Sequence, residues 1–155
     1  MHQITEITTG LQFPEGPIAM PDGSIIVVEI QRGTVSRVSP EGSIEVIATP
    51  GGGPNGAAIG PDGACYICNN GGFEWHERNS LAFPGDQPND YSGGRIERVD
   101  LSSGAVNLLY PQCNGNPFRW PNDLVFERQG GFWVRAIGYN LPRDKHHPLY
   151  QPHTL

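Results

Sequence analysis

A proline-led segment occurs three times along the chain, and this repeat constrains the fold more than any other feature. The copies span residues 13–28, 54–67 and 121–134. In each copy the turn glycine follows the proline by nine positions (23 − 14, 63 − 54 and 130 − 121). A proline-led loop, a short apolar strand, a glycine turn and a second apolar strand form one supersecondary unit. Its repetition indicates a repeat architecture.

The composition favours short strands joined by turns over helices. The chain has 21 glycines and 15 prolines among 155 residues, and both residue types punctuate chains at tight turns. Alternating apolar residues predict two further strands after each of the first two copies, whereas the third copy supplies only two strands. The expected strands are 17–20, 24–30, 34–38, 44–47, 57–60, 64–69, 95–99, 106–110, 124–127 and 132–136, with an edge strand leading in over 4–11.

Four antiparallel strands that recur at roughly 40 residues or more are typical of a β-propeller. We therefore expect an all-β chain with about two and a half four-stranded blades. Because propellers close with about four to eight blades, the chain should form part of a ring and could self-associate through its open blade edge. Residues 1–137 are expected to form this incomplete propeller domain, and residues 138–155 an irregular, flexible tail without strands.

Charge and termini exclude several partners. The net charge of −6 argues against nucleic acid and against an anionic membrane surface, since both attract basic patches. The first residues lack the basic and apolar regions of a signal peptide, and no apolar stretch is long enough to span a bilayer. These features predict a cytoplasmic protein.

Two of the three cysteines, Cys65 and Cys68, form a C-x-x-C pattern. On a strand, residues three apart point to opposite faces, so these thiols can neither pair nor share a metal. We expect them to be buried as small apolar residues.

Three oxygen-bearing side chains occupy the same place in the three units. Glu15, Asn55 and Asn122 each follow the proline directly and are expected just before the innermost strand. If the units are blades, these side chains converge on one end of the channel, where they suit a hard cation such as Ca²⁺ or Mg²⁺. The alternative for each residue is structural: an asparagine before a turn bonds its own backbone, and a glutamate in such a loop is solvated.

The ordered motifs Pro14-Glu15-Gly16-Pro17, Pro54-Asn55-Gly56, Asn69-Asn70-Gly71-Gly72-Phe73-Glu74-Trp75 and Pro121-Asn122-Asp123-Leu124 resemble the senescence marker protein (regucalcin)/gluconolactonase-like propellers. The resemblance covers residues 13–134. It implies a six-bladed propeller of about twice this length, one divalent cation in the channel mouth, and hydrolysis of a sugar lactone or related ester. The chain is similar to the N-terminal half of such an enzyme, with an unrelated sequence after Val134.

The same resemblance implies roles for individual residues. Glu15 and Asn122 would be metal ligands, and Asn55 would line the substrate site or hold a metal-bound water. Calcium is the expected cation, with Zn²⁺, Mg²⁺ and Mn²⁺ as alternatives. The catalytic carboxylate of the family has no counterpart in this chain, which predicts a fragment with weak or no activity. The alternative function is a non-catalytic propeller segment that binds a ligand or a protein.

Residues 70–93 are expected to form an aperiodic insertion between the second and third strands of the second unit. Loops of this length in a compact domain are usually functional or mobile. Polar and aromatic side chains there could cover a sugar-like ligand, and the expected substrate-binding residues are Asn70, Glu74 and Trp75, with Asn69, His76 and Tyr91 as further candidates. The alternative for His76, Glu77 and Arg78 is a solvated loop tip.

Overall fold

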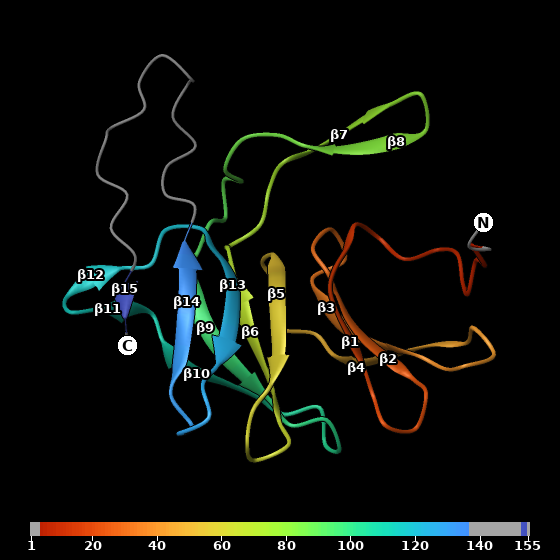
Figure 1. Ribbon diagram of the computed structural model, residues 1–155. Helices are drawn as coiled ribbons and strands as arrows, with labels where there is room; N and C mark the ends of the chain where they lie inside the picture. The colour runs from red at the N-terminus through yellow and green to blue at the C-terminus, as the bar shows by residue number, and fades with distance from the viewer. Residues whose placement is uncertain (1–3, 137–152, 155) are drawn as a thin grey trace.

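The computed structural model describes residues 4–136 and 153–154, and in this part the chain is all-β, as the sequence predicts. Two four-stranded antiparallel sheets, one three-stranded sheet and two small hairpins make up the fold (Figure 1). Within the described ranges no helix is long and apolar enough to cross a membrane.

The three main sheets correspond to the three repeat units. The first sheet contains β1 (Pro14–Ala19), β2 (Ile25–Glu29), β3 (Thr34–Val38) and β4 (Ile44–Ala48), in that order. The second contains β5 (Pro54–Ile59), β6 (Cys65–Asn69), β9 (Arg95–Val99) and β10 (Val106–Tyr110). The third contains β13 (Pro121–Phe126), β14 (Phe132–Ala136) and β15 (His153–Thr154).

The turn of each unit has the same hydrogen bond. The amides of Gly23, Gly63 and Gly130 donate to the carbonyl three residues earlier, at 3.0, 3.0 and 3.1 Å. Their φ angles are +84°, +78° and +90°, a left-handed conformation that glycine adopts without a steric penalty. The repeated turn glycines are thus explained by backbone geometry.

The sheets stand next to one another with their first strands at the centre. Strand β5 lies between β1 and β13 and contacts both (Figure 1). Apolar side chains fill the space between successive sheets: one cluster, which includes Val28 and Ile67, joins the first sheet to the second, and another, which includes Ile96 and Leu124, joins the second to the third. The second sheet is therefore covered on both faces, as a blade inside a propeller is.

The two C-x-x-C thiols lie on opposite faces of β6, as predicted. Cys65 belongs to the cluster facing the first sheet, and Cys68 to the cluster facing the third. Burial raises the pKa of Cys65 to about 12 and raises that of Cys68 as well. Neither thiol carries the thiolate character that metal binding or nucleophilic chemistry requires.

Four expectations about secondary structure were wrong. Residues 4–12 form no strand; instead, the Thr8 hydroxyl donates to the carbonyl of Gly42 and Arg32 donates to the carbonyl of Gly10. These contacts tie the segment to the first sheet through side chains rather than through a strand ladder. The innermost strands begin at the prolines, about three residues earlier than expected.

The third error concerns the insertion, which is not aperiodic. It contains a hairpin of β7 (Trp75–Arg78) and β8 (Leu81–Pro84) that projects from the sheets (Figure 1). A further small hairpin, β11 (Gln112–Cys113) with β12 (Asn116–Pro117), precedes the third unit and was not expected.

The expected tail lies largely outside the described residues. Its only described part is β15, which pairs with β14 through Val134↔His153 and Trp133↔Thr154. This pairing adds a third strand to the third sheet, whereas the sequence predicted none there.

Candidate metal and substrate site

The three predicted oxygen donors lie inside the innermost strands, at irregularities of the strand pairing. The register of β1 with β2 shifts between Glu15 and Ile18, and that of β5 with β6 shifts between Pro54 and Ala57. Strand β13 has the corresponding shift between Pro121 and Asp123. Asn55 and Asn122 lie within these irregularities, where a bulge re-aims the side chain that it carries. Glu15 still pairs with Val28 and borders the irregularity of β1. The prediction that they precede the strands is corrected accordingly.

Glycines bring these bulges together. A Cβ atom added to Gly16 would lie 2.8 Å from the amide nitrogen of Ala57 and 3.0 Å from the carbonyl oxygen of Asn55. The same atom on Gly56 would meet the carbonyl oxygen of Asn122 and lie 2.7 Å from the Cα of Asp123. Each glycine thus allows the bulge of one unit to touch the bulge of the next.

The donor side chains are accessible. Glu15 is exposed, and Asn55 and Asn122 are half-buried. None of the three makes a side-chain hydrogen bond or ion pair within residues 4–136, so the self-bonded alternative for the two asparagines does not apply there. Carboxylate and amide oxygens left free at adjacent bulges can accept a hard cation.

A metal site built only from His, Cys, Asp or Glu is absent from the described residues, because no three such side chains gather there. The side-chain donors predicted at the bulges are the carboxylate of Glu15 and the amide oxygens of Asn55 and Asn122. The residues fit Ca²⁺, Mg²⁺ or Mn²⁺ in the chemistry of their donors, but they supply few of the six or more oxygens that Ca²⁺ takes.

A saturated hydrogen-bond network holds the bulge of the second unit. The buried Asn69 accepts hydrogen bonds at Oδ1 from the amides of Gly53 and Gly71, both at 3.0 Å. Its Nδ2 donates to the carbonyl of Gly51 at 2.8 Å and to Oε2 of Glu97 at 2.9 Å. Asn69 thereby fixes the loop that leads to Asn55 and the first residues of the insertion.

The first unit has an equivalent network with different side chains. Glu29 is fully buried and occupies the place of Asn69; it accepts from the amide of Gln12 at 2.7 Å and from the hydroxyl of Ser36 at 2.6 Å. Arg32 forms an ion pair with it at 3.3 Å. In the third unit the corresponding residue is Ala136, so this anchor is missing there.

The predicted substrate-binding residues of the insertion occupy different environments. Asn70 is 1% exposed; its Oδ1 accepts from the amide of Gly72 at 2.8 Å, and its Nδ2 has no partner in the described part of the chain. Glu74 and Trp75 are half-buried at the base of the hairpin, where the backbone of Glu74 bonds to Asp86 and Gly85. Asn70 is thus enclosed by the loop, whereas Glu74 and Trp75 are accessible.

Aromatic side chains of the insertion connect the first unit to the third, and most of them were not predicted. Ring centroids lie 5.1 Å apart for Phe13 and Trp75, 6.0 Å for Trp75 and Phe73, and 4.7 Å for Phe73 and Trp120. Phe13 and Trp120 immediately precede repeat prolines and have φ angles of +55° and +56°. Such strained non-glycine residues cluster at functional sites. Both residues directly precede a repeat proline, and this common position is the sequence feature that could have identified them.

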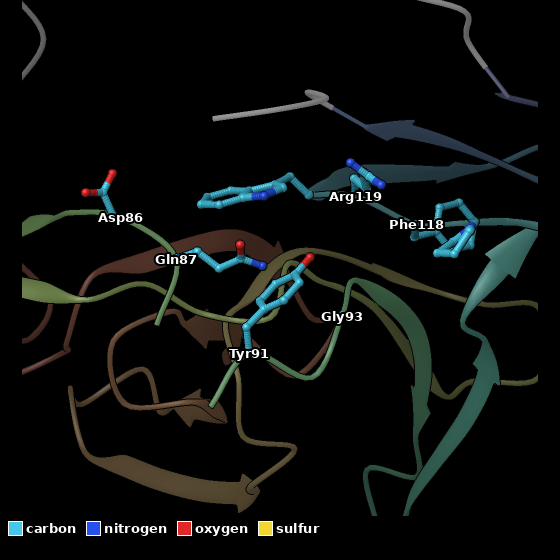
Figure 2. Close-up of a pocket in the computed structure, with 8 residues that line it drawn as sticks. Asp86, Gln87, Tyr91, Gly93, Phe118 and Arg119 are labelled. Carbon is cyan, nitrogen blue, oxygen red and sulfur yellow. The ribbon is translucent and has the colours of Figure 1, made fainter. Parts of the chain in front are cut away.

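A pocket of about 560 Å³ opens beside this aromatic row (Figure 2). Asp86, Gln87 and Tyr91 line it from the returning arm of the insertion, and Phe118, Arg119 and Trp120 line it from the segment before β13. Burial raises the pKa of Tyr91, and a tyrosine hydroxyl is protonated at neutral pH even without such a shift. The pocket combines aromatic faces with hydrogen-bonding groups, a combination typical of sites for small polar molecules.

Comparison with known proteins identifies the family. The family model described as the SMP-30/gluconolactonase/LRE-like region matches residues 13–153. The chain belongs to this family. The match extends beyond Val134, where the sequence resemblance was expected to end.

Two relatives show how much of such a protein the chain represents. It is 22% identical over 153 residues to the gluconolactonase of Zymomonas mobilis, covering 89% of this chain and 37% of the relative. A solved gluconolactonase structure from Xanthomonas campestris matches with a TM-score of 0.59 at 21% identity, covering 80% of this chain and 35% of that protein. The chain therefore spans little more than a third of the length of these relatives, and the structural likeness supports a partial propeller fold.

Proposed function

We propose that the chain contributes one part of a lactone-hydrolysing site of the gluconolactonase type, with a divalent cation held at the innermost strands. The observation that carries this proposal is the placement of Glu15, Asn55 and Asn122 at or beside the bulges of the three innermost strands, where their side chains make no hydrogen bond or ion pair within the described residues. Family membership supports the reaction class. Calcium is the proposed cation because every donor is a hard oxygen.

The chain's own residues would bind and orient the reactants. Glu15 and Asn122 would hold the cation, which in lactonases of this kind supplies charge stabilisation for the opening carbonyl. Asn55, between them, would contact the substrate or a bound water. The aromatic row and the pocket beside Trp120 would shield a sugar-derived lactone from bulk water. A general base is not among the proposed residues, and its loss typically costs 10²–10⁴-fold in rate.

We expect the 155-residue chain to open glucono-1,5-lactone only slightly faster than the spontaneous reaction, and only with Ca²⁺ present. An incomplete ligand set leaves the cation largely hydrated and weakly bound. Proton release measured for the wild type, Glu15→Ala and Asn122→Ala, with chelator as control, tests this. A rate far above background that both variants abolish would show that the chain completes its own site. A rate well above background that neither the chelator nor either substitution lowers would contradict the proposed metal site.

One observation favours a second candidate function, an interaction module without catalysis. The outer face of the third sheet exposes Val125 and Trp133 by 61% and 46%, and these residues pair directly across β13 and β14. The equivalent positions of the first two sheets, such as Ile26 and Tyr66, pack against the next sheet. Self-association through this face, or a covering partner, would remove it from water.

A further inference from the structure

Asp123 breaks the repeat at the position where the other two units need glycine. Aligned on their prolines, the units read Pro14-Glu15-Gly16, Pro54-Asn55-Gly56 and Pro121-Asn122-Asp123. Gly16 and Gly56 touch the bulge of the following unit and leave no room for a side chain. The third unit therefore carries a carboxylate where the repeat otherwise excludes any side-chain atom.

The carboxylate of Asp123 lies beside the candidate donors. A Cβ atom built on Gly56 would be 3.0 Å from Oδ1 of Asp123 and 2.7 Å from its Cα, which places this aspartate against the bulge that carries Asn55. Asn122 precedes it directly in the chain. The carboxylate therefore lies against the backbone bulge that carries Asn55, one residue after Asn122 in the chain.

A structural role does not account for this aspartate. Arg135 lies directly opposite Asp123 in the pairing of β13 with β14, which is the usual arrangement for a cross-strand ion pair. Among the described residues, however, no ion pair or hydrogen bond involves the Asp123 side chain. The carboxylate is exposed and remains available to a ligand.

We propose that Asp123 supplies a second carboxylate to the cation site, together with Glu15 and the amide oxygens of Asn55 and Asn122. This inference rests on the proposed function. Two carboxylates match the charge of a divalent ion, and amide oxygens complete a donor set of hard oxygens only.

Terbium luminescence provides the test on the 155-residue chain. Tb³⁺ stands in for Ca²⁺ as a hard, oxygen-seeking cation, and Trp120, three residues from Asp123, is placed to sensitise its emission. We expect Asp123→Asn to weaken Tb³⁺ binding by about tenfold or more and to lower the Ca²⁺ sensitivity of the signal in parallel, because ligand charge sets the affinity of such sites. Asp123→Glu should recover part of the affinity.

The control variant is Glu41→Gln, which removes one negative charge from an exposed turn distant in the chain from the bulges. It should leave the affinity unchanged, and circular dichroism should show all variants folded. If Asp123→Asn binds like the wild type while Glu15→Gln loses affinity, the assignment of Asp123 is wrong and the proposed function stands. If the wild type shows no saturable signal, both fail. If Glu41→Gln weakens binding as much as Asp123→Asn does, the effect is one of net charge and the assignment is also wrong.

Discussion

Gly56→Ala should destabilise the chain by about 3 kcal/mol and abolish cation binding. The added methyl group would meet the carbonyl oxygen of Asn122 and lie 2.7 Å from the Cα of Asp123. Both are backbone atoms of the innermost strand β13, so they can move away only if β13 separates from β5. Overpacking of this kind typically costs about 1–3 kcal/mol, occasionally more. Urea unfolding monitored by tryptophan fluorescence measures the loss.

Gly63→Ala is the matched control for this effect. Its added Cβ would meet nothing within 4 Å, so only the strain of a φ of +78° remains, about 1–2 kcal/mol for an alanine. Equal losses for the two variants would mean that close approach of the innermost strands is not what Gly56 provides. If Gly56→Ala still binds the cation, the contact between the bulges of β5 and β13 is not needed for cation binding.

Asn69→Ala should cost about 3 kcal/mol or more and loosen the insertion. The substitution removes four hydrogen bonds and leaves their buried partners unsatisfied. One of these partners is Oε2 of Glu97, a buried residue. Each unsatisfied buried group costs about 1–3 kcal/mol. Hydrogen exchange of the amides of Gly53 and Gly71 should accelerate together with the fall in stability.

Asn107→Ala serves as the comparison, because Asn107 is an exposed residue of β10. Substitutions at such positions usually stay within about 0.5 kcal/mol. A loss for Asn69→Ala no larger than this would show that the network does not hold the two loops. If the amide hydrogens of Gly53 and Gly71 exchange at the wild-type rate despite a large loss of stability, Asn69 does not stabilise the protein through these two loops.

The repeat could be predicted from the sequence because proline, turn glycine and apolar alternation each have a local cause. The turn glycines have the left-handed φ that the pattern implied, and Cys65 and Cys68 fall on opposite faces because strand geometry requires it. The starts of the innermost strands were missed because proline is usually read as a loop residue. Here each proline opens a bulge, where its missing amide hydrogen is tolerated.

The networks and the aromatic row could not be derived in the same way. Glu29 and Asn69 perform the same task with different chemistry, and their partners lie up to 28 positions away in the chain. Phe13 meets Trp75, and Phe73 meets Trp120, only once the insertion folds back over the units. Such contacts depend on tertiary structure, which no local pattern specifies. The sequence shows that Asp123 replaces a glycine of the repeat. Its proximity to Gly56 on β5 is seen only in the structure.

The central claim, that equivalent bulges of adjacent innermost strands share one cation, can be tested by anomalous scattering from a crystal grown with Mn²⁺. We predict one anomalous peak at the innermost strands, bound by oxygens of Glu15 and Asn122, with ligand distances no longer than about 2.6 Å for a hard cation. A peak bound only by residues away from the three bulges, or no peak at millimolar Mn²⁺, would contradict the account.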